Sequence, residues 1–242
     1  MRMGRADAVA ESLLALVLDG TFGVGEALPS EVELAGRFDV SRLTVREAIR
    51  SLASTRVIAV RQGKSSIVNP VEQWSPLDGR LLKARSRAGA DPLMLPRRLL
   101  EARRVVEVAI AELAALRRDG THLERMRTLQ DQMRVAHGRG DVAACAEADL
   151  AFHGVLFEAA DNVFLNALFE PLESVVRSLR DQTSSVAEIR EHALIRHGLI
   201  LDAVASGDPV AAREAMQAHL LQTEEDFETF LGPDDIADPA TG

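Results

Sequence analysis

The stretch that decides the N-terminal fold is Leu28–Val68, which reads LPSEVELAGRFDVSRLTVREAIRSLASTRVIAVRQGKSSIV. Ser30 starts a helix there, because serine is a good N-cap and the glutamates that follow suit the positive first turn. This helix runs to about Phe38, and Asp39-Val40 forms the turn that follows it. A second helix, with apolar residues at helical spacing, spans 41–54.

Two short β-prone runs follow that second helix, at residues 57–60 and 66–68, with Gly63 in the turn between them. A further amphipathic helix over residues 6–18 precedes the quoted stretch. Two helices joined by a tight turn and followed by a small β-hairpin predict a winged helix-turn-helix domain over residues 1–70.

The charge of the chain is unevenly distributed. The formal net charge is −9, yet the stretch from Ser41 to Lys64 carries six basic residues opposed by Glu47 alone. Salt screens distant charges beyond about 8–10 Å, so DNA meets this local basic face rather than the acidic remainder. We therefore predict that the N-terminal domain binds double-stranded operator DNA.

The second helix of a helix-turn-helix enters the major groove with its N-terminal residues nearest the bases. Arg42 or Arg46 suits a bidentate contact to guanine, whereas Ser41 and Thr44 suit phosphates. The alternative is that these arginines are ordinary solvent-exposed residues of a surface helix. This alternative explains a single arginine well, but it explains the whole pattern poorly. The expected DNA contacts are Ser30, Ser41, Arg42, Thr44, Arg46, Gly63 and Lys64.

The rest of the chain is helical in pattern. Residues 71–95 are expected to form a linker that contains one short helix. The remaining segments favour an antiparallel all-α bundle over 96–231, followed by a disordered tail at 232–242. The breaks include Asp208-Pro209, an N-cap followed by an N1 proline. The expected helices span 96–117, 121–137, 141–160, 163–181, 185–206 and 209–230.

Several features restrict the location of the protein. The chain has no run of about 18 uncharged apolar residues, so no membrane span is expected. Its first residues, MRMGRADAVAESLL, lack the layout of a signal peptide. Cys145 is the one cysteine, so no internal disulfide is possible. These points favour the cytoplasm.

Four residues of the helical region suggest a metal site. Asp149 and His153 are four residues apart and share a helix face. His197 lies ten residues before Gly207, and His219 lies ten residues after Pro209. If these two helices are antiparallel, each histidine lies about 15 Å from the turn, so the two face each other. A buried histidine is more often a hydrogen-bonded core residue, but three coincident placements make a metal about equally plausible.

One aspartate and three histidines would suit a divalent cation, with zinc as the first expectation and nickel, manganese, iron or cobalt also compatible. On the first bundle helix, Arg103 and Glu107 are also four residues apart. They either form an ordinary helix ion pair, or Arg103 binds an effector carboxylate bidentately. His122, His137 and His192 are interpreted as surface residues.

The N-terminal stretch resembles the GntR family of bacterial transcription regulators. It departs from the family pattern at Val32, where arginine is common, and at Arg56 and Ser65, where glycines are usual. The residues that carry the resemblance are Leu28, Pro29, Ser30, Glu31, Leu34, Ala35, Val40, Ser41, Arg42, Val45, Arg46, Glu47, Ala48, Leu52 and Gly63.

The helical region resembles the FCD effector domain of the FadR-like branch of that family, and so implies the FCD-like bundle expected above. Its matching segments are EARRVVE (101–107), DLAFH (149–153), RHGLILDAVASGD (196–208) and AAREAMQAHL (211–220). In metal-binding members the implied ligands fall on Asp149, His153, His197 and His219. WSPLDGRLL (74–82) resembles a linker segment of members that sense sugar acids.

The resemblance implies a dimeric, ligand-responsive regulator such as a repressor, not an enzyme. Its effector would be a small carboxylate, a sugar acid or a hydroxy acid, that binds the metal-containing pocket and changes operator affinity. Two alternatives remain open from the residues alone. The helical domain is a metal-dependent enzyme, or the metal is purely structural and chelation unfolds the domain.

Overall fold

The computed structural model describes residues 4–61, 65–88, 91 and 93–231. It is mostly helical, as the sequence predicts, and divides into two compact units, Met1–Ala90 and Asp91–Gly242. The tail predicted at 232–242 lies outside the described residues. Within the described part, no helix is both long and apolar enough to span a membrane.

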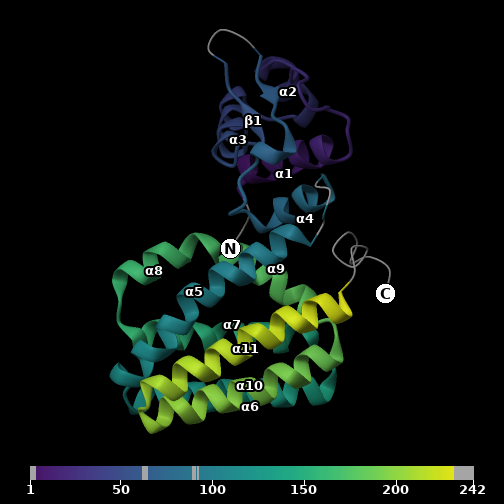
Figure 1. Cartoon of the computed structure of the whole chain (residues 1–242). Helices are drawn as coiled ribbons and strands as arrows, with labels where there is room; N and C mark the ends of the chain where they lie inside the picture. The colour runs from purple at the N-terminus through teal and green to yellow at the C-terminus, as the bar shows by residue number, and fades with distance from the viewer. Residues whose placement is uncertain (1–3, 62–64, 89–90, 92, 232–242) are drawn as a thin grey trace. The chain divides into compact units, whose positions relative to one another are not determined.

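The first unit has three helices, a two-stranded hairpin and a short helical extension (Figure 1). These elements are α1 (Arg5–Leu18), α2 (Glu31–Phe38), α3 (Arg42–Ser54), β1 (Ile58–Ala59), β2 (Ile67–Val68), the 3₁₀ turn η1 (Val71–Gln73) and α4 (Gly79–Ala88).

Side-chain caps fix the helix-turn-helix. Ser30 and Glu33 form a reciprocal capping box, in which the Glu33 amide donates to Ser30 Oγ and the Ser30 amide donates to Glu33 Oε2. Asp39 takes a left-handed conformation (φ 51°) that ends α2. Ser41 Oγ then accepts from the Thr44 amide at 3.1 Å and starts α3. The turn predicted at Asp39-Val40 is therefore confirmed.

The hairpin pairs its strands antiparallel, with Ile58 opposite Val68 and Ala59 opposite Ile67. Ala27 adds an isolated bridge to Ile67 on the outer side. Arg56, just before β1, has a left-handed backbone (φ 59°), although it carries a Cβ. This is the position at which the family commonly has glycine, so the wing begins with local strain.

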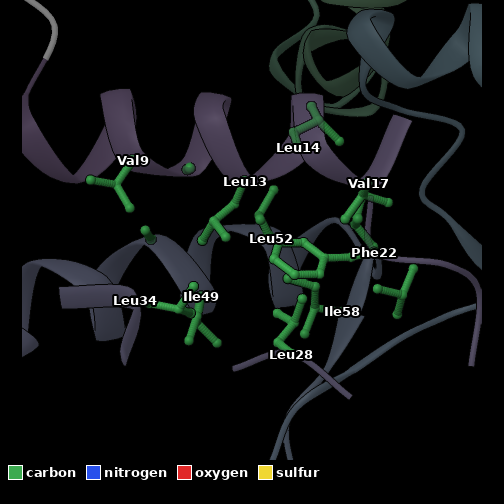
Figure 2. Packing of buried hydrophobic residues seen from close by; sticks show 14 of the residues in the cluster. Val9, Leu13, Leu14, Val17, Phe22, Leu28, Leu34, Ile49, Leu52 and Ile58 are labelled. Atoms are coloured by element: carbon green, nitrogen blue, oxygen red, sulfur yellow. The ribbon is translucent and has the colours of Figure 1, made fainter. Parts of the chain in front are cut away.

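The core of this unit lies between α1, α3 and the hairpin. Figure 2 shows Leu13 of α1 and Leu52 of α3 pointing toward each other, with Phe22 beside them; all three are buried. Trp74 and Leu81 belong to the same apolar cluster. Part of the segment expected as a linker thus packs on the winged unit through η1 and α4.

The second unit is an all-helical bundle. α5 packs against α7 and α11, α10 packs against α11 and α6, and α6 packs against α7, so five helices close into a ring (Figure 1). The remaining helices, α8 and α9, lie on α5 and α7 respectively. The elements are α5 (Met94–Arg117), α6 (Gly120–Arg139), α7 (Val142–Ala160), α8 (Val163–Phe169), η2 (Glu170–Leu172), α9 (Glu173–Thr183), α10 (Ala187–Ser206) and α11 (Pro209–Phe230).

One predicted helix of the bundle is broken. The sequence predicts one continuous helix over residues 163–181, but the 3₁₀ turn η2 separates α8 from α9. Pro171 lies in this turn, and proline lacks the N–H that an uninterrupted helix requires. α8 then contacts α5, whereas α9 contacts α7, and we call these two helices together the arm.

The turn between α10 and α11 sets the level at which these helices face each other. Gly207 ends α10 in a left-handed conformation (φ 76°), and Asp208 caps α11 through the amides of Val210 and Ala211. Arg118 donates to the Val204 and Ala205 carbonyls at the end of α10. A compact turn held in this way fixes the register of the two helices.

Candidate functional site

The exposed start of α3 carries the residues expected to contact DNA. Arg42 and Arg46 are exposed, whereas Val45 and Ile49 on the opposite face are buried in the core. Arg50 lies one turn beyond Arg46 and is also exposed. The core-facing stripe therefore turns a basic face of α3 toward solvent.

Arg46 is held by a carboxylate of the preceding helix. Its Nε and Nη2 donate to Glu31 Oε1 and Oε2 at 3.0 and 2.8 Å, although Arg46 is 46% exposed. The hydrogen bond from Arg46, with smaller contributions from Arg42 and Arg50, lowers the pKa of Glu31 below its ordinary value. Glu31 is therefore ionised near neutral pH and fixes the direction of the Arg46 guanidinium.

The hydroxyl groups expected at phosphates also have local partners. Ser30 Oγ lies 2.7 Å from Glu33 Oε2, and Ser41 Oγ lies 2.8 Å from Thr44 Oγ1. In this structure Ser30 and Ser41 cap the starts of α2 and α3, and the DNA contacts of these residues and of Thr44 stay predictions. Gly63 and Lys64, expected at the wing tip, lie outside the described residues.

In the second unit the structure brings together three histidines from three helices. His153 of α7, His197 of α10 and His219 of α11 are at most 7% exposed, and their candidate ligand atoms lie within 4.8 Å of one another. The His197 and His219 rings are 4.6 Å apart between centroids. His153 Nε2 and His197 Nε2 are separated by 3.1 Å.

Asp149 borders this histidine cluster but also faces an arginine. Its carboxylate lies 3.8 Å from His153 Nε2 and 3.6 Å from His197 Nε2. Arg180 Nε of α9 lies closer, 2.7 Å from Asp149 Oδ1, and both residues are buried. Asp149 therefore neutralises a buried guanidinium at the edge of the cluster, and its role as a metal ligand stays a prediction.

Glu107 links the cluster to Arg103 on α5. Its Oε1 accepts from Arg103 Nε at 2.6 Å, and its Oε2 lies 2.6 Å from His153 Nδ1. Burial by itself raises the pKa of Glu107, but Arg103 and His153 outweigh burial and hold it below its ordinary range. A carboxylate behind a ligating imidazole orients the ring so that its other nitrogen faces the metal.

Burial keeps two of the imidazoles neutral. Desolvation lowers the pKa of His197 to about 3, against the opposing effect of Asp149. Desolvation also lowers the pKa of His219 well below its ordinary value, assisted by the neighbouring histidines. Metal ligation requires neutral imidazole, so both rings have the protonation state that a metal needs.

The geometry fits a metal ion. Two imidazole nitrogens on one ion at a metal–nitrogen distance of about 2.1 Å stand roughly 3.0–3.4 Å apart for angles between 90° and tetrahedral. The 3.1 Å separation of the His153 and His197 Nε2 atoms agrees with this value. His219 Nε2 is buried without a hydrogen-bond partner among the described residues, and such a nitrogen is commonly satisfied by a ligand.

A cavity of about 680 Å³ opens onto this cluster. We call its buried polar end the floor, formed by Arg103, Glu107, His153 and Arg180. We call its solvent end the rim, formed by Glu147, Glu158, Glu170, Glu173 and Arg177. The volume lies in the range of small-molecule pockets, and polar groups converge at one end, as in many ligand sites.

Arg180 is the site residue that the sequence analysis missed, and the link from Glu107 to His153 was also not predicted. Arg180 follows the buried Leu179 and lies four residues after the buried Val176, so it falls on the inward face of α9. A charged residue on an otherwise apolar stripe was the available signal, since such a group needs a partner. The partner, Asp149, comes from a different helix, which the sequence pattern alone does not identify.

The other histidines lie apart from the cluster. His122 takes part in the capping of α6, where its amide donates to Asp119 Oδ1. His192 is partly exposed, and its Nδ1 lies 2.9 Å from the buried Asp226 of α11. His137 is half-buried near the end of α6.

Comparisons with known proteins agree with both units. Residues 5–68 match the family model described as bacterial regulatory proteins, gntR family, and residues 98–222 match that of the FCD domain. The second match contains all four predicted metal ligands, and the first contains α1 to the wing.

Two curated relatives align over nearly the whole chain. The galactonate operon transcriptional repressor of Escherichia coli is 29% identical, over 89% of this chain and 93% of that protein. The HTH-type transcriptional regulator Mce2R of Mycobacterium tuberculosis is 32% identical, over 86% and 85%. A solved structure described as Lar, which controls the Listeria monocytogenes agr system, has the same fold, with a TM-score of 0.64, 20% identity and coverage of 95% and 99%. The chain therefore belongs to the GntR family of bacterial transcription regulators and carries a C-terminal FCD domain.

Proposed function

We propose that this regulator binds operator DNA through the exposed face of α3 as a dimer, and that a small carboxylate in the FCD domain changes its operator affinity. The observation that supports this most directly is the cavity, whose floor contains two buried arginines and His153 of the histidine cluster. A ligand bound there contacts α5, α7 and α9 at once, so it can favour one arrangement of these helices.

Asp149, His153, His197 and His219 would hold a divalent cation. Zinc suits one carboxylate and three imidazoles, and nickel, manganese, iron or cobalt accept the same donors. When bound, such an ion would supply a Lewis acid that attracts a carboxylate. The chain's own contribution is to keep the imidazoles of His197 and His219 neutral and to orient His153 through Glu107.

The fixed charges of the site explain why the cation matters. Arg103 is paired with Glu107, and Arg180 is paired with Asp149, so two positive charges are balanced by two negative ones. An effector carboxylate therefore adds an unbalanced negative charge unless a cation is present. Arg103 and Arg180 line the cavity and would complete the recognition of the carboxylate.

The E. coli relative is named for the galactonate operon, and this name, with the linker resemblance, places sugar acids and hydroxy acids in the panel of carboxylates to be tested beside acids with other bodies. Such a regulator alternates between a conformation with high operator affinity and one with low operator affinity. The effector changes operator affinity only to the extent that it binds one of these conformations more tightly than the other.

The test begins with operator selection from a random duplex pool, using full-length protein loaded with zinc. Fluorescence anisotropy then measures operator affinity with and without a panel of carboxylates, for wild type, His197→Ala and His192→Ala. The last variant removes a histidine outside the cluster and serves as the matched control. We expect one acid to change operator affinity in wild type and in His192→Ala, and to lose its effect in His197→Ala.

Two outcomes contradict the proposal. A full response in His197→Ala after verified loss of metal excludes a metal-assisted effector site. No response to any acid, with chelation alone unfolding the domain, assigns the metal a structural role.

A further inference from the structure

We infer that the effector is a monocarboxylate with a largely apolar body, rather than a polyhydroxylated acid, and that Phe157 helps to select it. This inference rests on the proposed effector function of the cavity. It follows from what lines the space between the floor and the rim, and from the charge of the rim.

The floor accommodates one carboxylate. Arg180 is 4% exposed, and its Nη2 lies 3.4 Å from His153 Nε2, so its guanidinium borders the histidine cluster as well as the cavity. Arg103 approaches the same floor from α5. The acceptors nearby, Glu107 and Asp149, already face these arginines, so the floor has few free partners for further hydroxyl groups.

The wall between floor and rim is mostly apolar. It includes Leu150 and Phe157 of α7, Val163 and Phe169 of α8, and Val176 of α9. The Phe157 and Phe169 rings are 4.6 Å apart between centroids, so they form one aromatic surface. A body with a hydroxyl on each carbon would bury several of those hydroxyls here without partners, which is unfavourable.

Asn166 is the exception in this wall. Its Oδ1 is buried and has no hydrogen-bond partner among the described residues. It provides a contact for one polar substituent on the effector, whereas a six-carbon sugar acid carries five hydroxyls. The wall therefore fits an aliphatic or aromatic body with at most one polar group better than a sugar chain.

The rim disfavours a second carboxylate. Glu147 is paired with Arg177, and Glu158 is paired with Arg125, so their charges are largely compensated. Glu170 and Glu173 are exposed and add negative charge at the same opening. A dicarboxylate long enough to reach the rim would place its second group beside them, where like charges repel.

The test is isothermal titration calorimetry of the zinc-loaded, full-length protein with acetate, butyrate, hexanoate, gluconate and adipate. Each methylene buried against the wall strengthens binding by about fourfold. We expect hexanoate to bind at least tenfold more tightly than acetate, gluconate or adipate.

Variants then locate the apolar contact. Phe157→Ala should reduce the ratio of hexanoate to acetate affinity at least threefold while acetate affinity stays unchanged. Phe164→Ala removes an aromatic ring of α8 that is 79% exposed and does not line the cavity, so it should leave the ratio unchanged. Leu150→Ala shortens a partly buried wall residue, and it carries the test if Phe157→Ala fails to fold.

The outcomes separate this inference from the proposed function. Tighter binding of gluconate than of hexanoate, or equal affinity along the acetate-to-hexanoate series, overturns the inference and leaves a carboxylate effector in place. Absence of binding by all five acids to zinc-loaded protein overturns both.

Discussion

His153 Nε2 and His197 Nε2 lie 3.1 Å apart, although 44 residues separate them in the chain. The imidazole of His219 completes the group, and its buried Nε2 has no partner among the described residues. Two nitrogens at this separation, next to an unsatisfied third, match the spacing that ligation of a shared cation requires.

The first prediction concerns metal binding. Zinc added to metal-free protein should raise the melting temperature of wild type, because an ion that binds the folded state alone stabilises it by about 4 kcal/mol at a thousandfold excess over Kd. His153→Ala and His219→Ala should lose most of this shift, as measured by differential scanning fluorimetry. His192→Ala should keep it; an equal loss in this variant would point to zinc bound elsewhere.

The second prediction concerns pH. The pKa of His197 is lowered to about 3 in the folded protein, compared with about 6.5 in an unfolded chain. Between these values the unfolded chain takes up a proton that the folded chain does not, so stability falls as pH decreases from 6.5 toward 3. The slope is at most about 1.4 kcal/mol per pH unit for each such histidine.

Urea unfolding of metal-free protein at pH 7, 6 and 5 measures this slope. His197→Gln should reduce the slope of the unfolding free energy against pH by up to about 1.4 kcal/mol per pH unit, which is the contribution of one proton. An unchanged slope in this variant would show that His197 is protonated in the folded protein.

Much of this site was predictable from the sequence, for a specific reason. The equal distances of His197 and His219 from an Asp-Pro restart place both rings at one level whenever the two helices are antiparallel. Helix periodicity and caps also predicted the order of the winged unit. Caps and periodicity depend on neighbouring residues alone, and in these segments they determine where each helix begins and ends and which side chains face each other.

What escaped prediction depends on contacts between distant elements. Arg180 enters the site because α9 follows a break at Pro171 and then lies on α7. Similarly, Arg46 has a suitable sequence position for DNA, but its pairing with Glu31 follows from how α2 packs against α3. Periodicity identifies which face of a helix is buried, but not which side chain of another helix it meets.

The third prediction concerns the turn between α10 and α11, which fixes the register that brings His197 and His219 opposite each other. A Cβ at Gly207 would lie 2.7 Å from Arg118 Nη2, in addition to the strain of its left-handed backbone. Gly140 is also left-handed, but a Cβ there meets nothing within 4 Å. Gly140→Ala should therefore cost about 1 kcal/mol of strain, and Gly207→Ala should cost clearly more.

The free energy of unfolding from urea titration checks this difference. The additional loss of unfolding free energy in Gly207→Ala, compared with Gly140→Ala, measures the cost of displacing Arg118 from the Val204 and Ala205 carbonyls. Equal losses in the two variants would mean that Arg118 moves aside without cost.

The fourth prediction concerns the strained start of the wing. Arg56→Gly should raise the free energy of unfolding by up to about 1 kcal/mol, because glycine adopts the left-handed backbone without the Cβ clash. Thermal unfolding of the full chain measures the effect. A loss of stability would show that the Arg56 side chain makes a contact worth more than the strain.

The fifth prediction concerns DNA discrimination. Glu31 directs the Arg46 guanidinium but also places a negative charge beside Arg42 and Arg50. Glu31→Gln should therefore strengthen binding to random duplex, since it removes repulsion of the phosphates, and reduce the ratio of operator to random-duplex affinity several-fold, since Arg46 is no longer held in one orientation.

The matched control is Glu33→Gln, which makes the same change in charge on the same turn of α2. Glutamine still completes the capping box with Ser30, and the hydrogen bonds of the Glu33 side chain go to Ser30, whereas Arg46 is bound by Glu31. Anisotropy titrations with selected operator and random duplex, at several salt concentrations, separate the two effects. If both variants lower the affinity ratio equally, charge alone accounts for it; a loss confined to Glu31→Gln assigns the discrimination to the orientation of Arg46.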